Sequence, residues 1–144
     1  MADTLSQEER SDRMSRIRGT NTGPELLVRR YLHALGLRFK LHDRRLPGKP
    51  DLVLPKYRTV VFVNGCFWHA HECQKGRIPG TRSAFWREKF ERNRTRDMRN
   101  VRALRRLGWR VLTVWECSLA NTSKRGRTLG TLARKILAGT KGAP

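Results

Sequence analysis

The chain has 144 residues, of which 32 are lysine or arginine and 12 are aspartate or glutamate, so its formal net charge is +20. This excess goes far beyond what solubility requires and favours a polyanionic partner, with DNA or RNA the leading candidates. No apolar run approaches the roughly 20 residues that a bilayer-spanning helix needs, which argues against a membrane protein. The three cysteines and the polar beginning, without an apolar signal region, favour the cytoplasm, where such a protein would associate with the nucleoid.

The length of the chain suits one hydrophobic core, and we expect two parts. Residues 1–21 would form a flexible basic arm, which has few large apolar side chains and becomes ordered only against a negatively charged partner. Residues 22–144 would form a single domain. The arginines of the arm are Arg10, Arg13, Arg16 and Arg18.

The first predicted element is a helix that begins at a capping box, Thr22-Gly23-Pro24-Glu25, and ends at Gly36. A strand over residues 37–42 follows. Two further strands, over residues 50–54 and 57–63, are separated by a turn at Pro55-Lys56, and we expect them to form a hairpin.

A long helix is predicted over residues 83–107, because its apolar side chains fall on one narrow stripe. A strand over residues 109–115 and a helix near residues 128–138 follow. This order of elements predicts the α/β class, with a mixed sheet flanked by helices. The stripe of the long helix consists of Phe90, Val101, Leu104 and Leu107.

A cluster of metal-binding residue types occupies residues 66–73, and one further cysteine follows the strand over residues 109–115. Three cysteines and one histidine suit a tetrahedral Zn²⁺, and four protein ligands leave no open position. We therefore predict a structural zinc that ties the loop after the third strand to the end of the fourth. The alternative is that the cysteines are reduced and buried without a metal. The expected ligands are Cys66, His71, Cys73 and Cys117.

Asp51 follows Pro50 and begins a strand, where a carboxylate projects from the edge of a rigid sheet. Such a carboxylate can hold Mg²⁺, which prefers oxygen ligands. A turn residue at the start of a strand is the more common role of a Pro-Asp pair. On these residues alone, both interpretations stay open.

Four motifs spread along the chain resemble one known family. They are Leu46-Pro47-Gly48-Lys49-Pro50-Asp51, Gly65-Cys66-Phe67-Trp68-His69 with His71 and Cys73, Phe85-Trp86, and Leu107-Gly108-Trp109-Arg110-Val111-Leu112 with Trp115-Glu116-Cys117. Together they are similar to the very short patch repair (Vsr) endonucleases of bacteria. The resemblance implies a restriction-endonuclease-like core, related to the PD-(D/E)xK nucleases, with an added structural zinc. It also implies nicking of duplex DNA on the 5′ side of a thymine mispaired with guanine, the lesion left when 5-methylcytosine deaminates.

The resemblance also assigns roles to four residues. Asp51 would bind the catalytic Mg²⁺, and His69 would be the general base that activates the attacking water. Glu25 would be a further acidic member of the site, and Asp97 on the long helix would orient His69. Each of the last three has a more local alternative: His69 contacts phosphate or supports another ligand, Glu25 completes its capping box, and Asp97 pairs with an arginine.

At two positions the chain departs from the pattern of the family, which typically has threonine and histidine there. The residues are Val63 and Asn64. The backbone carbonyl of Val63 could still bind Mg²⁺, because carbonyl oxygens are Mg²⁺ ligands. The Asn64 amide cannot act as a base, so its contribution to the catalytic site would be limited to hydrogen bonding.

The aromatic side chains suggest how a mismatch would be recognised. By resemblance, Phe67 and Trp68 enter the base stack beside the mismatch with help from Trp86, and Met14 of the arm inserts from the opposite groove. A T·G pair lowers the cost of opening the duplex, so such wedges favour mismatched sites. Lys89 would contact bases or backbone at the lesion. The alternative for the aromatic residues is ordinary core packing.

The long helix carries many arginines, which we expect to contact phosphates and to make binding depend on salt. They include Arg87, Arg92, Arg94, Arg96 and Arg99. Two hypotheses follow from the whole sequence. The first is a monomeric, Mg²⁺-dependent, strand-specific mismatch endonuclease that acts on double-stranded DNA. The second is a zinc-stabilised nucleic-acid-binding protein without catalysis, which would leave Asp51 and His69 unexplained.

Overall fold

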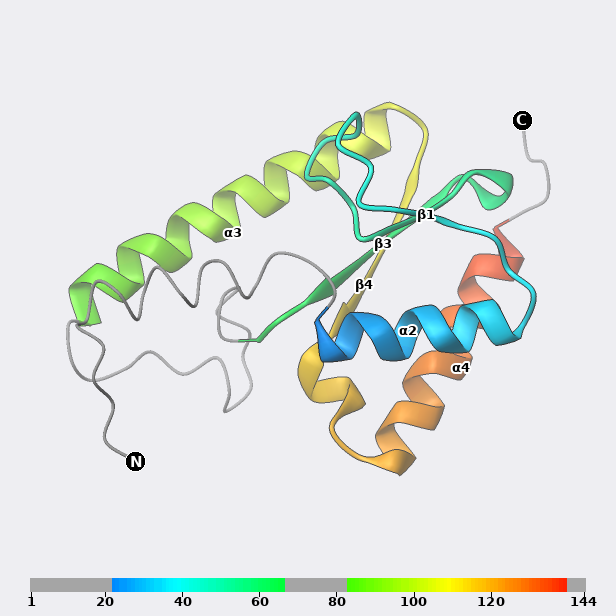
Figure 1. The fold of residues 1–144 in the computed structure, drawn as a ribbon. Coiled ribbons are helices and arrows are strands. Elements are labelled where there is room, and N and C mark those ends of the chain that lie inside the picture. The colour runs from blue at the N-terminus through cyan, green and yellow to red at the C-terminus, as the bar shows by residue number, and fades with distance from the viewer. Residues whose placement is uncertain (1–21, 67–82, 140–144) are drawn as a thin grey trace.

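The computed structural model describes residues 22–66 and 83–139 of the chain. Its strands form one sheet in the order β1-β2-β3-β4 (Figure 1). β2 pairs antiparallel with both β1 and β3, whereas β3 pairs parallel with β4. The sheet is therefore mixed, as the sequence predicts. The strands are β1 (Lys40–Leu41), β2 (Leu52–Leu54), β3 (Thr59–Asn64) and β4 (Arg110–Trp115).

Helices cover both faces of the sheet. α2 (Gly23–Ala34) and α4 (Thr122–Ala138) lie side by side on one face, and α3 (Ser83–Arg106) lies on the other (Figure 1). Successive side chains of a strand point to opposite faces, so each strand contributes to two cores. The predicted α/β fold class is confirmed. The core under α2 and α4 includes Val28, Leu32, Leu52, Leu54, Val61, Val114, Leu129, Leu132 and Ile136. The core under α3 is built on Val53, Val60 and Leu104.

The helix α2 begins at the predicted cap. The Thr22 hydroxyl accepts a hydrogen bond from the Glu25 N–H (3.3 Å), and a proline occupies the first turn, where its missing N–H costs nothing. At the other end, Gly36 adopts a φ of +81°, and the Leu37 N–H donates to the Leu32 carbonyl (3.1 Å). Both boundaries follow from the residues that the sequence singled out.

The strand predicted over residues 37–42 is shorter than expected. Only Lys40 and Leu41 pair with β2. The reason is that Leu37 is used to close α2 and is itself buried. The prediction was correct in kind and wrong in length.

The predicted hairpin is confirmed. A 3₁₀ turn over Pro55–Tyr57 and an Arg58 with φ +51° reverse the chain, and Leu52 pairs with Val61. The strand β2 begins at Leu52, so Asp51 lies directly before it. The His42 N–H donates to the Asp51 carbonyl (3.1 Å), which continues the pairing of β1 with this segment.

The long helix α3 agrees with the prediction to one residue. Phe90 and Leu104 are buried, but Leu107, the last residue of the predicted stripe, is 54% exposed. That expectation was wrong because the chain leaves the helix here: Gly108 has a φ of +90°, and the Trp109 N–H donates to the Leu104 carbonyl (3.0 Å). The N-terminal turns of α3 extend beyond the sheet (Figure 1).

The last helix begins earlier than predicted, at Thr122 in place of residue 128. Asn121 is its N-cap, and its side chain accepts a hydrogen bond from the Lys124 N–H (2.9 Å). The first turns carry polar side chains outside the apolar stripe, so a search for apolar periodicity misses them. Within the described ranges, no helix combines the length and the apolarity needed to cross a bilayer.

Candidate active site

Asp51 is fixed at the start of the hairpin. It follows the buried Pro50 and is itself half-buried. Its Oδ2 accepts a hydrogen bond from the Val63 N–H on the neighbouring strand (2.7 Å). A hydrogen bond from a backbone N–H to a carboxylate is short and strong, and it holds the carboxylate against the sheet. The Asp51 side chain thus contacts the neighbouring strand while its residue lies directly before β2.

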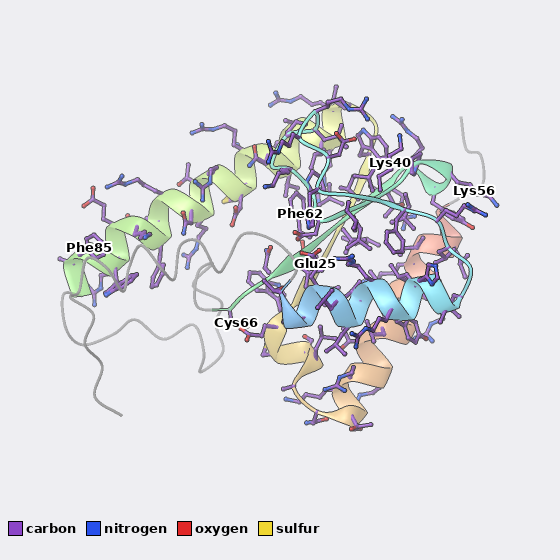
Figure 2. The ribbon with its side chains drawn as sticks, in the orientation of Figure 1. Glu25, Lys40, Lys56, Phe62, Cys66 and Phe85 are labelled. Atoms are coloured by element: carbon purple, nitrogen blue, oxygen red, sulfur yellow. The ribbon has the colours of Figure 1, made fainter. Side chains whose placement is uncertain are left out.

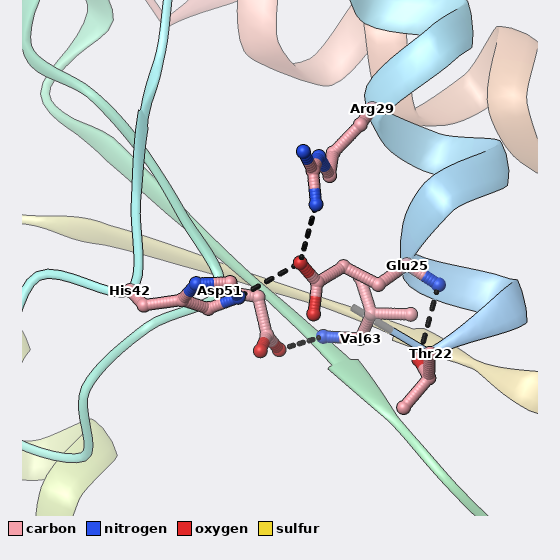
Figure 3. A network of polar contacts seen from close by, with 6 residues as sticks. All are labelled: Thr22, Glu25, Arg29, His42, Asp51 and Val63. Carbon is pink, nitrogen blue, oxygen red and sulfur yellow. Dashed lines mark hydrogen bonds and ion pairs between the residues drawn. The ribbon is translucent and has the colours of Figure 1, made fainter. Parts of the chain in front are cut away.

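Glu25 reaches the same region from α2. It is only 1% exposed, and its Oε2 lies 2.8 Å from His42 Nε2 and 3.4 Å from Arg29 Nη1 (Figure 3). A buried carboxylate is costly unless it is partnered, and here two donors and the N-terminal end of a helix offset that cost. Its backbone N–H makes the cap, while its carboxylate oxygen contacts residues outside the capping box. Figure 2 shows Glu25 at the N-terminal end of α2, facing the sheet.

His42 is the site residue that the sequence analysis missed. It directly follows β1, and its side chain is 17% exposed. No motif surrounds it. The available signal was its position: β1 pairs with the start of β2, so a side chain at the end of β1 lies near Asp51.

These side chains form a group that could hold a metal ion. Glu25, His42 and Asp51 each offer one ligand atom, and the three atoms all lie within 4.8 Å of one another. Two carboxylate oxygens suit Mg²⁺, which commonly binds proteins through one or two carboxylates and keeps several waters. The donor set therefore fits the cation that the sequence predicts at Asp51.

A surface ion pair orders the turn after His42. The Arg45 guanidinium donates to both carboxylate oxygens of Asp43, at 3.1 and 3.2 Å. These side-chain hydrogen bonds are the main reason that the pKa of Asp43 lies below its ordinary value, and the same pairing raises the pKa of Arg45. Asp43 is thus held charged by its neighbour, one residue from the site.

Val63 and Asn64 form the end of β3. Val63 packs toward the core under α2 and α4, whereas Phe62 packs toward α3. By alternation, the half-buried Asn64 side chain lies on the α3 face. Val63 thus contacts Asp51 through its backbone, and Asn64 lies next to it along the strand.

Two of the four predicted zinc ligands are brought together. In the parallel pairing of β3 with β4, Asn64 lies opposite Trp115, and the two cysteines each follow two residues later. The Cys117 N–H donates to Cys66 Sγ (3.3 Å), and Cys66 is fully buried. The Cys66 N–H also donates to Glu116 Oε1 (3.3 Å). The other two predicted ligands, His71 and Cys73, lie outside the described residues.

Comparison with known proteins identifies the family. Residues 2–75 match the family model described as DNA mismatch endonuclease Vsr. This chain belongs to the Vsr family. Type II nicking enzyme V.XorIIP of Xanthomonas oryzae pv. oryzae is 50% identical over 121 residues, 84% of this chain and 89% of that protein. DNA mismatch endonuclease Vsr of Escherichia coli is 44% identical over 124 residues, 86% of this chain and 80% of that protein.

The Vsr resemblance also points to three residues of α3. Trp86 is half-buried and packs on Phe90, with ring centroids 5.7 Å apart, and on Phe85, at 5.1 Å. Lys89 Nζ lies 5.7 Å from the centroid of the Trp86 ring. Asp97, nearer the middle of the helix, is half-buried. Phe85 lies at the end of α3 remote from Glu25 (Figure 2), so this aromatic cluster is separate from the acidic site.

The remaining residues that the Vsr resemblance singles out lie outside the described residues. They are Met14, Phe67, Trp68 and His69, together with the zinc candidates His71 and Cys73. Their expected roles stay predictions from the sequence.

Proposed function

We propose that this Vsr family member nicks duplex DNA on the 5′ side of the thymine in a T·G mismatch, by Mg²⁺-dependent hydrolysis of a phosphodiester bond. One observation carries the proposal: Asp51, bonded to the Val63 N–H at the sheet edge, shares a potential cation site with the buried Glu25. The family match and relatives whose names describe nicking and mismatch endonucleases support the reaction class. The fold is consistent with a restriction-endonuclease-like core.

Asp51 and the Val63 carbonyl would hold the Mg²⁺. In a paired strand, the N–H and the C=O of one residue point to the same edge. The Val63 N–H points to Asp51, so its carbonyl faces the same side. When bound, the cation would neutralise charge on the phosphate that is attacked. Glu25 would add negative charge beside it and accept hydrogen bonds from bound water.

Proton transfer would fall to His69, which lies on the same short segment as the zinc candidates. A neutral imidazole titrates near physiological pH and can take a proton from the attacking water. Asp97 would orient that imidazole, a role that suits a half-buried carboxylate. Asn64 would contribute a hydrogen bond near the phosphate, because an amide has no proton affinity for base catalysis.

A structural Zn²⁺ would stabilise the segment that carries His69. Cys66 and Cys117 support this proposal, because they meet at the ends of two parallel strands although they are 51 positions apart in the sequence. With His71 and Cys73 they would complete the tetrahedral set.

DNA would be held by the basic side chains and opened by aromatic wedges. Phe67 and Trp68 would enter the base stack at the mismatch, and Met14 would insert from the other groove. From α3, Trp86 would assist this insertion and Lys89 would contact bases or backbone at the lesion. We propose one domain over residues 22–144 with residues 1–21 closing over the duplex, acting as a monomer near the nucleoid in the cytoplasm. The net charge of +20 supports this location.

The test uses two duplexes that differ in one base. A T·G duplex and its C·G counterpart, labelled on each strand in turn, are incubated with zinc-loaded protein and Mg²⁺ or with a chelator. We expect one nick, 5′ of the mispaired thymine, only with Mg²⁺ and only in the T·G duplex. Tight binding without a nick would contradict the proposal and favour the non-catalytic binder. Equal cleavage of both duplexes would contradict the mismatch specificity.

A further inference from the structure

His42 adopts a backbone conformation that needs an explanation. Its φ is +48°, in the left-handed region that residues other than glycine rarely occupy. Such a conformation is strained and persists only where the surroundings hold it. Here the His42 N–H donates to the Asp51 carbonyl (3.1 Å), and the imidazole Nε2 lies 2.8 Å from Glu25 Oε2. The backbone thus connects His42 to one acid and the side chain connects it to the other.

We propose that His42 is a positioning residue of this site, which fixes the Glu25 carboxylate so that it meets the cation held at Asp51. The inference deepens the proposed function and rests on it for the identity of the cation as Mg²⁺. The geometry of the three side chains does not depend on the proposed function: their ligand atoms lie within 4.8 Å of one another.

The hydrogen bond has a defined direction. An ionised carboxylate only accepts, so His42 Nε2 carries the hydrogen and donates it to Glu25. Both the neutral ring with its hydrogen on Nε2 and the imidazolium can do this, so the contact does not depend on the charge of the ring. It is one reason that a nearly fully buried carboxylate at this position is tolerated.

Two donors converge on one oxygen of Glu25. His42 Nε2 at 2.8 Å and Arg29 Nη1 at 3.4 Å both act on Oε2. A carboxylate oxygen has two lone pairs, so these contacts engage both and fix the plane of the group. These two contacts set the orientation in which the carboxylate would meet the cation or its bound water. Without His42, the carboxylate could rotate about the weaker Arg29 contact.

Direct ligation of the cation by His42 is the competing role. Imidazole nitrogen suits Mn²⁺, Co²⁺ or Zn²⁺ better than Mg²⁺, whose preferred ligands are oxygens. The 2.8 Å contact with Glu25 uses Nε2 as a donor, so direct ligation would have to use the other ring nitrogen, Nδ1. The two roles predict different results for a glutamine at this position, since its amide N–H can donate to Glu25 but it has no imidazole nitrogen for the cation.

The test measures Mn²⁺ binding to the full chain by electron paramagnetic resonance, with Asp51→Asn defining the background from other sites. We expect His42→Ala to weaken Mn²⁺ binding about tenfold or more, which is typical when a residue that orients a ligand is lost. His42→Gln should keep most of the affinity, because its side chain can still donate. Both variants carry the same left-handed backbone cost, so the comparison isolates the side chain. His33→Ala, an exposed histidine in the last turn of α2, is the matched control and should bind as the wild type does.

Two results would overturn the inference. One is a His42→Ala variant that binds Mn²⁺ as tightly as the wild type. The other is a pair of observations: the wild-type spectrum shows the spin-echo modulation of a directly bound imidazole nitrogen, and His42→Gln binds Mn²⁺ as weakly as His42→Ala does. If His42→Ala does not fold, the wild-type spectrum decides: directly bound nitrogen contradicts positioning, and its absence supports it. A wild-type protein that binds Mn²⁺ but does not nick a T·G duplex would contradict the proposed function and leave the positioning role of His42 standing.

Discussion

Glu25 makes two kinds of contact at the start of α2. Its N–H completes the cap of α2, and its Oε2 contacts His42 and Arg29. The backbone and the carboxylate of one residue point in different directions, so a helix start can cap itself and still supply an acid to a neighbouring sheet. A local explanation of a residue does not exclude a role in the site.

The cysteine pair supports the first prediction. We expect Cys117→Ser to lower the zinc content from about one ion per chain to near zero and to lower the melting temperature by roughly 10 °C or more, because zinc binding contributes to folding. The measurements are metal analysis by mass spectrometry and thermal unfolding.

The neighbouring Ser118→Ala variant serves as the control and should keep its zinc. If Cys117 were only a packed thiol, the serine variant would keep the zinc content of the wild type and lose about 1 kcal/mol of stability or less. That result would remove Cys117 from the ligand set.

The residues of the site could be predicted from the sequence to different degrees. Asp51 could be predicted, because a Pro-Asp pair before an apolar strand places a carboxylate at a sheet edge. The meeting of Cys66 with Cys117 could be predicted too, because each follows a strand and the two strands are neighbours. The pairing of β1 with β2 places His42 near Asp51, but its contact with Glu25 could not be predicted, because that contact depends on a left-handed φ of +48°, which no residue pattern indicates.

At the scale of elements, apolar periodicity predicted the sheet and all three helices of the described residues, but not every boundary. The helix α3 was predicted to within one residue because Gly108 ends it. The start of α4 was missed by six residues because its first turns follow Asn121, a polar cap, and not an apolar stripe. Boundaries set by hydrogen bonds of single side chains escape a search for periodicity.

The loop between His42 and Asp51 supports the second prediction. Gly48 has a φ of +77°, and a Cβ placed there would lie 3.0 Å from the Cβ of Asn100 on α3. We expect Gly48→Ala to lower the free energy of unfolding by about 1–2 kcal/mol, from backbone strain and this contact together. Urea denaturation measures the change.

Gly126→Ala is the matched control for Gly48→Ala. Gly126 lies inside α4, and a Cβ there meets nothing within 4 Å. The alanine should raise the free energy of unfolding by about 0.4–1 kcal/mol, because it restricts the unfolded chain. If both variants shifted the free energy of unfolding in the same direction, the left-handed conformation of Gly48 would not explain the effect of Gly48→Ala.

For the whole molecule, charge is the dominant property. The net charge of +20 cannot be explained by the fold, because the buried residues of both cores are almost all apolar. On α3 the exposed arginines outnumber the exposed acidic side chains, Glu88 and Glu91, and the helix lies on the face of the sheet opposite α4 (Figure 1). The shape of the molecule therefore separates a candidate phosphate-binding face from the α4 side.

The third prediction concerns the salt dependence of duplex binding. If about six phosphates are contacted, affinity for a matched duplex should fall roughly 10³-fold between 50 and 200 mM salt. Arg99→Gln on α3 should reduce the slope of log affinity against log salt by about one. Fluorescence anisotropy at several salt concentrations measures both.

Arg127→Gln provides the control for Arg99→Gln. Arg127 is exposed on α4 and donates to Ser123 Oγ (3.2 Å). Its loss should leave the slope unchanged if DNA lies against α3. Affinity that does not depend on salt, or an equal effect of the two variants, would show that α3 is not the phosphate-binding face.

The most direct test of the central claim is the rate of single-turnover nicking by Asp51→Asn on a T·G duplex with Mg²⁺. The substitution keeps the size of the side chain but removes the charge that would hold the cation at the sheet edge. We predict that the nicking rate falls at least about 100-fold while the affinity for the duplex stays within error of the wild type. A variant that nicks at the wild-type rate would contradict the account, because Asp51 would then have no part in the chemistry.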